Sequence, residues 1–261
     1  MTGNPLLTDL ATDGDHLDAA RIAEAAGRAL LDLRARALEV EVGGWRLGDQ
    51  GDFGANHLIL DLLAQAHPGD AVLSEEALDS SARLSAHRVW IVDPLDGTRE
   101  YGEHGRDDWA VHVALVVGGE LAAGAVALPA QERVLFTGPE SALPPLPPIP
   151  DRPRMVVSRS RPPAVTGAIQ AAIGGELVPM GSAGAKAMAV VLGQAEVYAH
   201  AGGQYEWDNA APAAVAAAAG LWVSRLDGSP LRYNQPDPWL PDLMICRREL
   251  APAALAAAAS R

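Results

Sequence analysis

The most informative stretch of the sequence is an apolar run that ends in two aspartates, Arg88-Val-Trp-Ile-Val-Asp-Pro-Leu-Asp-Gly-Thr98. The apolar residues predict a buried strand, and Asp93 and Asp96 follow at its carboxyl end, where open α/β sheets bind their ligands. Pro94 restricts the backbone so that both carboxylates can point to one side. Because Asp-Pro and Asp-Gly also form ordinary turns, the stretch taken alone favours a turn.

The same stretch offers suitable groups for binding magnesium and phosphate. Mg²⁺ prefers oxygen ligands in near-octahedral geometry and keeps several waters. The carboxylates of Asp93 and Asp96 and a turn carbonyl such as that of Leu95 meet this demand together with a phosphate oxygen. Gly97 lets the main chain approach an anion, and the amides of Gly97 and Thr98 can then donate to a phosphate.

Two further acidic segments lie at the predicted ends of elements. Ser74-Glu75-Glu76 ends a short apolar strand, and as an isolated match it is most simply a solvated acidic pair. Glu206-Trp-Asp-Asn209 opens a predicted helix, where Asp208 is expected to be the N-cap. A capping carboxylate presents a fixed charge, so Asp208 can bind a metal as well. The three acidic segments together favour one metal site over three unrelated surface features.

The order and spacing of these segments resemble the inositol monophosphatase superfamily of Mg²⁺-dependent, lithium-sensitive phosphatases. The matching features, between about residues 15 and 247, are Asp52 at the start of a helix, Ser74-Glu75-Glu76, and residues 90–98 and 207–211. This resemblance implies a layered αβαβα phosphatase fold of the α/β class, with the active site between its two halves. It also implies hydrolysis of a phosphate monoester.

The resemblance implies a role for each of these acidic residues. The groups expected to hold two or three Mg²⁺ ions are Glu75, Asp93, the Leu95 carbonyl, Asp96 and Asp208. Asp93 would bridge two of the ions. Thr98, oriented by Asp52 and Glu75, would help to activate the attacking water.

Three details resemble one subgroup, the bacterial 3′-phosphoadenosine 5′-phosphate phosphatases of the CysQ type, or 3′(2′),5′-bisphosphate nucleotidases. They are the run Arg99-Glu-Tyr101, the segment Gly181-Ser-Ala-Gly-Ala-Lys186 and the ending Asn209-Ala-Ala-Pro212. The implied substrate is an adenosine bisphosphate and the products are AMP and phosphate, which would link the protein to sulfate assimilation.

A second phosphate on the substrate needs a binding site of its own. Lys186 falls in the first turn of a predicted helix, where a cation is unfavourable to the helix dipole unless an anion lies nearby. Lys186 and Ser182 are therefore expected to bind the part of the nucleotide that carries the second phosphate. Gly97, Thr98 and Asp208 are expected to contact the substrate as well.

Other functions stay open at this point. The metal-binding residues would serve an inositol-1-phosphate or fructose-1,6-bisphosphate phosphatase equally well. A different class of protein, an inactive nucleotide sensor, would have no reason to keep the water-activating residues. The seven histidines show no metal-binding spacing, so each is expected to be a surface or packing residue.

Composition limits the kinds of partner. The net charge of −13 over 261 residues repels nucleic acids, so no nucleic-acid polymer is expected to bind. One cysteine, Cys246, excludes an internal disulfide framework and indicates the cytoplasm. The sequence shows neither a secretory signal nor an apolar run of membrane-spanning length, so no membrane association is expected. A homodimer remains open.

A proline-rich stretch divides the chain, with seven prolines in residues 138–153. It predicts an α+β domain over residues 1–140, a linker over 141–153 and an α/β domain over 154–261. Helices are expected over residues 15–38, from Asp52 to His67, and over 163–173, 184–192, 208–219 and 252–259. Strands are expected over 71–74, 88–92, 109–117, 120–128, 133–137, 155–158, 177–180, 196–200, 221–225 and 243–246, with a hairpin turn at Gly118-Gly119.

Overall fold

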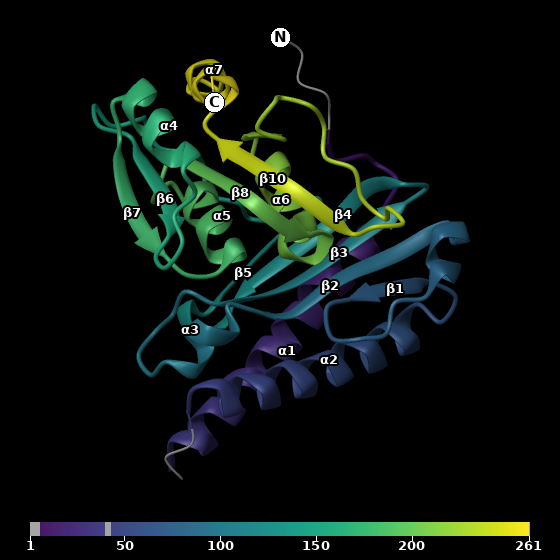
Figure 1. The fold of residues 1–261 in the computed structure, drawn as a ribbon. Helices are drawn as coiled ribbons and strands as arrows, with labels where there is room; N and C mark the ends of the chain where they lie inside the picture. Colours follow the sequence, from purple (N-terminus) through teal and green to yellow (C-terminus); the bar gives the residue numbers. More distant parts are fainter. Residues whose placement is uncertain (1–5, 40–42, 261) are drawn as a thin grey trace.

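Two five-stranded sheets form the framework of the protein, as the computed structural model of residues 6–39 and 43–260 shows (Figure 1). The first sheet has the order β1-β2-β3-β4-β5 and comprises β1 (Ala71–Ser74), β2 (Arg88–Asp96), β3 (Ala110–Val117), β4 (Glu120–Leu128) and β5 (Arg133–Phe136). The second has the order β7-β6-β8-β10-β9 and comprises β6 (Arg154–Ser158), β7 (Glu176–Met180), β8 (Val197–Tyr205), β9 (Trp222–Ser224) and β10 (Trp239–Cys246). Both sheets mix parallel and antiparallel pairs.

Helices fill the space between the two sheets and cover their outer faces (Figure 1). The helices are α1 (Asp13–Glu39), α2 (Trp45–Ala66), α3 (Thr98–Gly102), α4 (Val165–Ile173), α5 (Ala183–Val191), α6 (Glu206–Ala218) and α7 (Ala251–Ala259). The long helices α1 and α2 cover the outer face of the first sheet, α5 and α6 lie between the sheets, and α4 and α7 cover the second sheet. The layers are therefore αβαβα, as the resemblance implied, and the mixed α/β class is confirmed.

The alternation of side chains along a strand explains this layering. In β2, Trp90 and Val92 pack in the core shared with α1 and α2, whereas Val89 and Ile91 pack in the core shared with α5 and α6. Successive strand residues point to opposite faces, so a strand between two helical layers must be apolar on both. The apolar run of β2 therefore contributes side chains to two cores.

The predicted elements all occur, with several changed boundaries. The Gly118-Gly119 hairpin is confirmed, since Val117 pairs with Glu120 and both glycines have positive φ. β2, β8 and β10 are longer than predicted, and the shift of a residue or two at other ends is ordinary. β5 ends at Phe136 and β6 starts at Arg154, while the division into two domains stays a prediction.

The predicted start of the second helix at Asp52 is wrong. α2 begins at Trp45 and places Asp52 in its third turn. Two glycines in the first turns of α2 are needed because the helix passes close to its neighbours: a Cβ at Gly48 would lie 2.5 Å from Thr98 Cγ2, and one at Gly51 would lie 2.9 Å from the Tyr101 ring. Among the described residues, no helix is long and apolar enough to span a bilayer.

Candidate active site

Three carboxylates from two elements meet at the C-terminal end of β2. Asp93 and Asp96 belong to β2 and Asp208 to the first turn of α6, and one oxygen from each lies within 4.8 Å of the other two. Residues three apart in a regular strand point to opposite faces. Here the pairing of β2 with β3 shifts between Asp93 and Asp96, and this irregularity lets both carboxylates reach the same place.

Asp96 lies at the N-terminus of α5. Its carboxylate accepts hydrogen bonds from the Gly184 amide at 2.5 Å, the Ala183 amide at 3.1 Å and the Ser182 hydroxyl. Burial alone would raise the pKa of Asp96, but the His112 imidazole at 3.3 Å, the Ser182 hydroxyl and nearby Lys186 hold the pKa below its ordinary value. Asp96 is therefore charged at neutral pH.

Asp208 is not the N-cap that the sequence predicted. α6 begins two residues earlier, at Glu206, so Asp208 is the third residue of the helix. Its carboxylate reaches back to accept from the Tyr205 amide at 2.6 Å, which is the geometry of a capping box. Burial, followed by the charge of Asp96, raises the pKa of Asp208 to about 6 although the Tyr205 amide lowers it in part.

Asp93 is buried, and hydrogen bonding differs between its two carboxylate oxygens. Its Oδ1 accepts from the Leu95 amide at 3.0 Å, while its buried Oδ2 has no hydrogen-bond partner among the described residues. Burial, with the carboxylates of Glu75 and Asp96, raises the pKa of Asp93 far above its ordinary value. A buried oxygen without a donor is costly, so this arrangement calls for a cation or a proton.

The residues assigned to water activation lie beside this cluster. The Thr98 hydroxyl donates to the Leu95 carbonyl at 3.2 Å, and Asp52 approaches Thr98 from α2. Burial and the charge of Glu76 raise the pKa of Asp52 to about 7, and its buried Oδ1 is also without a hydrogen-bond partner among the described residues. Asp52 is therefore able to exchange a proton near neutral pH.

Glu75, which follows the end of β1, is a further acidic residue near the three carboxylates. Its side chain is exposed, yet partial withdrawal from water, followed by the charges of Asp208 and Asp52, raises its pKa to about 8. Glu75 does not belong to the compact group of three carboxylates. Its interaction with them is nevertheless strong enough to favour its protonated form when no cation is near.

His112 was missed by the sequence reasoning. It lies on β3 opposite Asp93, and its fully buried imidazole contacts Asp96 and the carbonyl of Trp207. Burial would lower the pKa of His112, but Asp96 and the Trp207 carbonyl raise it above its ordinary value. A lone histidine in a strand otherwise made of Ala, Val and Leu was the available signal.

Lys186 and Ser182 lie near the cluster, but their hydrogen bonds are partly used within the protein. The Lys186 ammonium donates to the carbonyls of Gly181, at 3.1 Å, and Ser182, and only 5% of the side chain is exposed. Burial lowers its pKa, against the raising effect of Asp96 and other carboxylates. These two carbonyls are partners for the Lys186 ammonium, a role that the sequence analysis assigned to an anion. An ammonium has three donors, so one remains for a ligand.

A cavity of about 330 Å³ adjoins the carboxylates. The predicted site residues that line it are Asp96, Gly97, Ser182, Lys186 and Asp208. Arg99, Arg159 and Arg161 line it too, so cationic side chains lie next to the acidic group. Gly97 has a φ of +88°, and a Cβ there would lie 3.0 Å from Ser182, so this narrow turn requires glycine.

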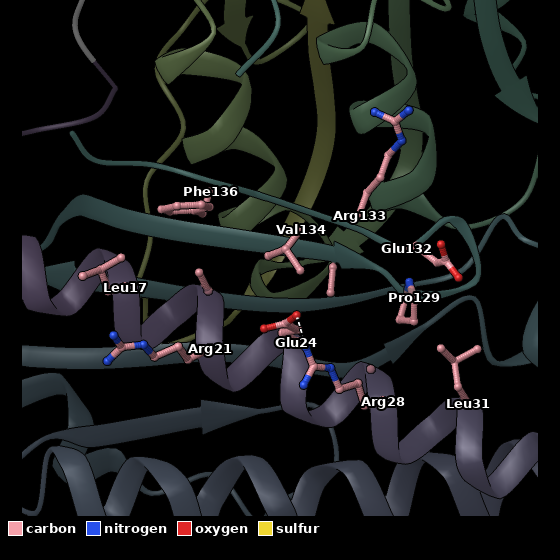
Figure 2. Close-up of a pocket in the computed structure, with 13 residues that line it drawn as sticks. Leu17, Arg21, Glu24, Arg28, Leu31, Pro129, Glu132, Arg133, Val134 and Phe136 are labelled. Carbon is pink, nitrogen blue, oxygen red and sulfur yellow. Dashed lines mark hydrogen bonds and ion pairs between the residues drawn. The ribbon is translucent and has the colours of Figure 1, made fainter. Parts of the chain in front are cut away.

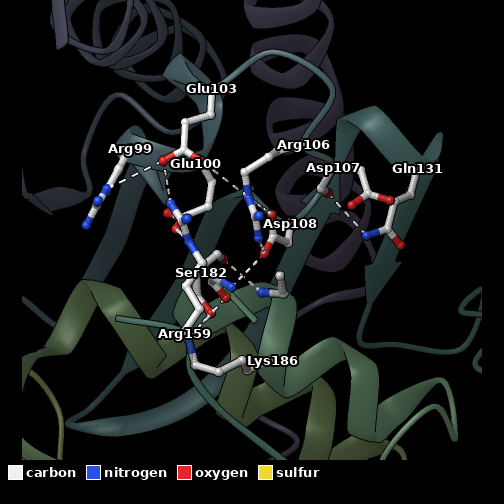
Figure 3. Close-up of polar contacts among 12 residues, drawn as sticks. Arg99, Glu100, Glu103, Arg106, Asp107, Asp108, Gln131, Arg159, Ser182 and Lys186 are labelled. Carbon is white, nitrogen blue, oxygen red and sulfur yellow. Dashed lines mark hydrogen bonds and ion pairs between the residues drawn. The ribbon is translucent and has the colours of Figure 1, made fainter. Parts of the chain in front are cut away.

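A network of polar contacts joins the two sheets at one side of the cavity (Figure 3). Arg159 donates to Glu100 and Glu103, each at 2.6 Å, and Asp108 accepts from the Gly181 amide at 2.6 Å. Glu100 is thus paired with Arg159 instead of offering a free acid, and Asp108 holds the segment that leads into α5. Tyr101, which follows Glu100, is fully buried, and its hydroxyl donates to the Leu30 carbonyl.

A larger cavity of about 490 Å³ lies elsewhere, between α1 and the β4–β5 edge (Figure 2). Its walls include Leu17, Leu31 and Phe136, with a Glu24–Arg28 pair at 2.5 Å on α1. None of the predicted site residues lines it. Size alone therefore does not identify the active site; the carboxylates do.

The described carboxylates fit a divalent cation that prefers oxygen. Asp93, Asp96 and Asp208 offer only oxygen ligands, and the unpartnered Oδ2 of Asp93 lacks the donor that a cation would replace. His112 is close by, but one of its ring nitrogens faces a carbonyl and the other faces Asp96. Both contacts mark it as a support for the ligands.

Comparison with known proteins gives consistent findings along the chain. The model of the inositol monophosphatase family matches residues 16–141 and 154–260. The 3′-phosphoadenosine 5′-phosphate phosphatase of Mycobacterium tuberculosis is 53% identical over 245 residues, which cover 90% of this chain and 89% of that protein. The 3′(2′),5′-bisphosphate nucleotidase CysQ of Escherichia coli is 31% identical over 207 residues, 72% of this chain and 80% of that protein.

A solved structure agrees with the fold. The crystal structure of CysQ from Bacteroides thetaiotaomicron, a bacterial member of the inositol monophosphatase family, superimposes with a TM-score of 0.75 at 26% identity. The match covers 92% of this chain and 99% of that one. The unmatched gap in the family model, residues 142–153, falls within the proline-rich connection.

Proposed function

The chain belongs to the inositol monophosphatase family, and from that premise we propose that it is a phosphatase that removes the 3′-phosphate of 3′-phosphoadenosine 5′-phosphate. The products are AMP and inorganic phosphate. The activity of the relative that is 53% identical over most of both chains supports this substrate. The CysQ relative supports the same reaction class.

One observation carries the proposal: the cavity that Asp96 and Asp208 line is also lined by several cationic side chains. Among the residues that line the cavity, Asp96 and Asp208 belong to the group of three carboxylates, whereas Arg159, Arg161 and Lys186 are basic. A nucleotide with two phosphates suits this division, since the reacting phosphate needs metal ions and the second phosphate needs protein cations. A monophosphate leaves the basic part without an anion.

Two or three Mg²⁺ ions are proposed to be held by Glu75, Asp93, the Leu95 carbonyl, Asp96 and Asp208. When bound, Mg²⁺ neutralises charge on the phosphate and makes water a better nucleophile. Thr98 then orients the attacking water, and Asp52, with a pKa of about 7, accepts the proton that the water loses. The amides of Gly97 and Thr98 bind the reacting phosphate, while Lys186 and Ser182 bind the rest of the nucleotide. The P–O3′ bond breaks as the new P–O bond forms, and the departing O3′ oxygen takes a proton from solvent water to become the 3′-hydroxyl of AMP.

Inhibition by Li⁺ and a cytoplasmic location accompany this proposal as predictions from the resemblance and composition, while a homodimer stays open. A phosphate-release assay with 3′-phosphoadenosine 5′-phosphate, inositol-1-phosphate and fructose-1,6-bisphosphate tests the substrate. The nucleotide should give the highest kcat/KM, and excess chelator should abolish release. A preference for either sugar phosphate would contradict the nucleotide assignment, and full turnover in chelator would contradict the metal requirement.

A further inference from the structure

His112 lies where three elements of the site meet. It is on β3, and its imidazole is completely buried. Nδ1 is 3.0 Å from the carbonyl oxygen of Trp207 in α6, and Nε2 is 3.3 Å from Oδ2 of Asp96 in β2. Because Asp208 follows Trp207 directly, one side chain touches both Asp96 and the backbone beside Asp208.

The third element is α5, which leaves room for the imidazole only because residue 184 is glycine. A Cβ at Gly184 would lie 2.0 Å from His112 Nε2 and 3.1 Å from Asp96 Oδ2. The Gly184 amide itself donates to that same oxygen of Asp96 at 2.5 Å. The imidazole of His112 therefore requires glycine at position 184, since a side chain there would overlap it.

We propose that His112 is a positioning residue, which with Gly184 holds Asp96 and the first turn of α6 at the separation that metal binding by Asp96 and Asp208 requires. This role rests on the proposed metal site. The Trp207 carbonyl can only accept, so Nδ1 donates to it, and Nε2 faces the carboxylate. Residues that orient metal ligands in this way typically affect metal affinity or activity by about 10–100-fold when they are replaced.

Replacing His112 with Asn or with Gln tests its two contacts separately. Asn places its NH₂ group near the position of Nδ1, and Gln places it near that of Nε2. His112→Asn can keep the bond to the Trp207 carbonyl but loses Asp96, whereas His112→Gln can keep the contact with Asp96. Titration of the metal-depleted protein with Mg²⁺ in a calorimeter should show an increase in Kd of about 10–100-fold for His112→Asn and a smaller one for His112→Gln.

Gly184→Ala tests the same arrangement from the opposite side. The added methyl group should displace the imidazole and raise the Mg²⁺ Kd, but it should add little when His112 is already Asn, because the two changes affect one contact. His87→Asn, at an exposed histidine, is the matched control and should bind Mg²⁺ like the wild type.

The outcomes separate this inference from the proposed function. Folded His112→Asn and Gly184→Ala proteins that both bind Mg²⁺ like the wild type would overturn the role of His112. A wild-type protein that takes up no Mg²⁺ would instead overturn the proposed metal site. If His112→Asn fails to fold, His112→Gln and Gly184→Ala carry the test, and an unchanged Kd in both would reject the proposal.

Discussion

Strand β2 has a group of carboxylates at each end, and the two groups are built in opposite ways. At its start, Arg88 donates to Asp15 at 2.5 Å and to Asp70 at 2.9 Å, and the Trp90 indole also donates to Asp70. At its end, Asp93 and Asp96 meet Asp208. Within residues 6–39 and 43–260, no lysine or arginine forms an ion pair with any of these three.

The pKa values differ between Asp15 at the start of β2 and Asp93 and Asp208 at its end. Asp96 is an exception because, against the effect of burial, His112 and the Ser182 hydroxyl hold its pKa below the ordinary value. Burial would raise the pKa of Asp15, but Arg88 and the Thr12 amide and hydroxyl bring it below its ordinary value. At the other end, burial raises the pKa of Asp93 strongly and that of Asp208 to about 6. A buried carboxylate with its own arginine stabilises the fold, whereas one left without a cation is available to bind a metal.

The strongest test of this contrast is Asp93→Asn. Loss of a central metal ligand should reduce kcat by more than about 10³-fold, beyond the roughly 10–100-fold expected for a supporting residue. The metal-free protein should at the same time melt at a higher temperature, because Asn removes a buried carboxyl that can stay in place without a metal only by taking up a proton. Phosphate release at saturating Mg²⁺ and thermal unfolding in chelator measure the two effects. A lower melting temperature in chelator would contradict the view that Asp93 has no lysine or arginine partner among the described residues and destabilises the metal-free fold.

The groups beside the metal cluster come next in size. Thr98→Ala and Glu75→Gln should each reduce kcat by about 10²–10⁴-fold while the protein stays folded, because both residues are proposed to activate water. Glu120→Gln, at an exposed glutamate of the β3–β4 hairpin near the start of β2, is the control and should keep a kcat close to that of the wild type. Wild-type turnover by Thr98→Ala at saturating Mg²⁺ would remove this hydroxyl from the mechanism.

Arg88→Met addresses the opposite end of the strand. Removing the arginine leaves Asp15 and Asp70 without their counter-charge, which should cost about 3–5 kcal/mol of stability and lower Tm by roughly 10 °C. Activity per folded molecule should not change. Chemical unfolding and a kcat measurement well below Tm test both statements, and a large loss of kcat in stable protein would link this cluster to catalysis.

Lys186→Met sharpens the assignment of the second phosphate. Loss of one charge-assisted contact should reduce kcat/KM for 3′-phosphoadenosine 5′-phosphate by about 10–150-fold and affect a monophosphate little. The contacts of the ammonium with the Gly181 and Ser182 carbonyls offer another explanation for the lysine. An equal loss on both substrates would favour that structural role.

The last expected effect is a change of stability with pH in the metal-free protein. Asp52 and Asp208 have pKa values of about 7 and 6 when folded, above the value of about 3.9 expected when unfolded. The folded state then binds protons more tightly, so stability should fall as the pH rises from about 4 to 8, by up to about 1.4 kcal/mol per pH unit for each carboxyl. Asp15, whose pKa is lowered, should lose its contribution only as the pH falls below about 4. Thermal unfolding in chelator at several pH values would show the trend, saturating Mg²⁺ should reduce the part due to Asp208, and a flat profile in chelator would contradict the trend.

Most of the fold and the acidic residues of the cluster were predictable because they depend on local order in the chain. The apolar run before Asp93, the two glycines of the hairpin and the apolar periodicity of α1 are properties of neighbouring residues. These local signals predicted every described helix longer than five residues and every strand. They also predicted the acidic residues that the structure brings together, Asp93, Asp96 and Asp208.

Contacts between distant residues were decided only by the tertiary structure. α2 could be identified as starting at Trp45 only once Gly48 and Gly51 were seen to pack on Thr98 and Tyr101, because a glycine in sequence indicates a turn as readily as a close approach. His112 is 16 residues beyond Asp96 and 72 before Gly184, and no local pattern joins the three. Sequence order specifies which side chains are present along each strand, whereas the meeting of β2, β3, α5 and α6 determines which carboxylates are neutralised and which remain open to a metal.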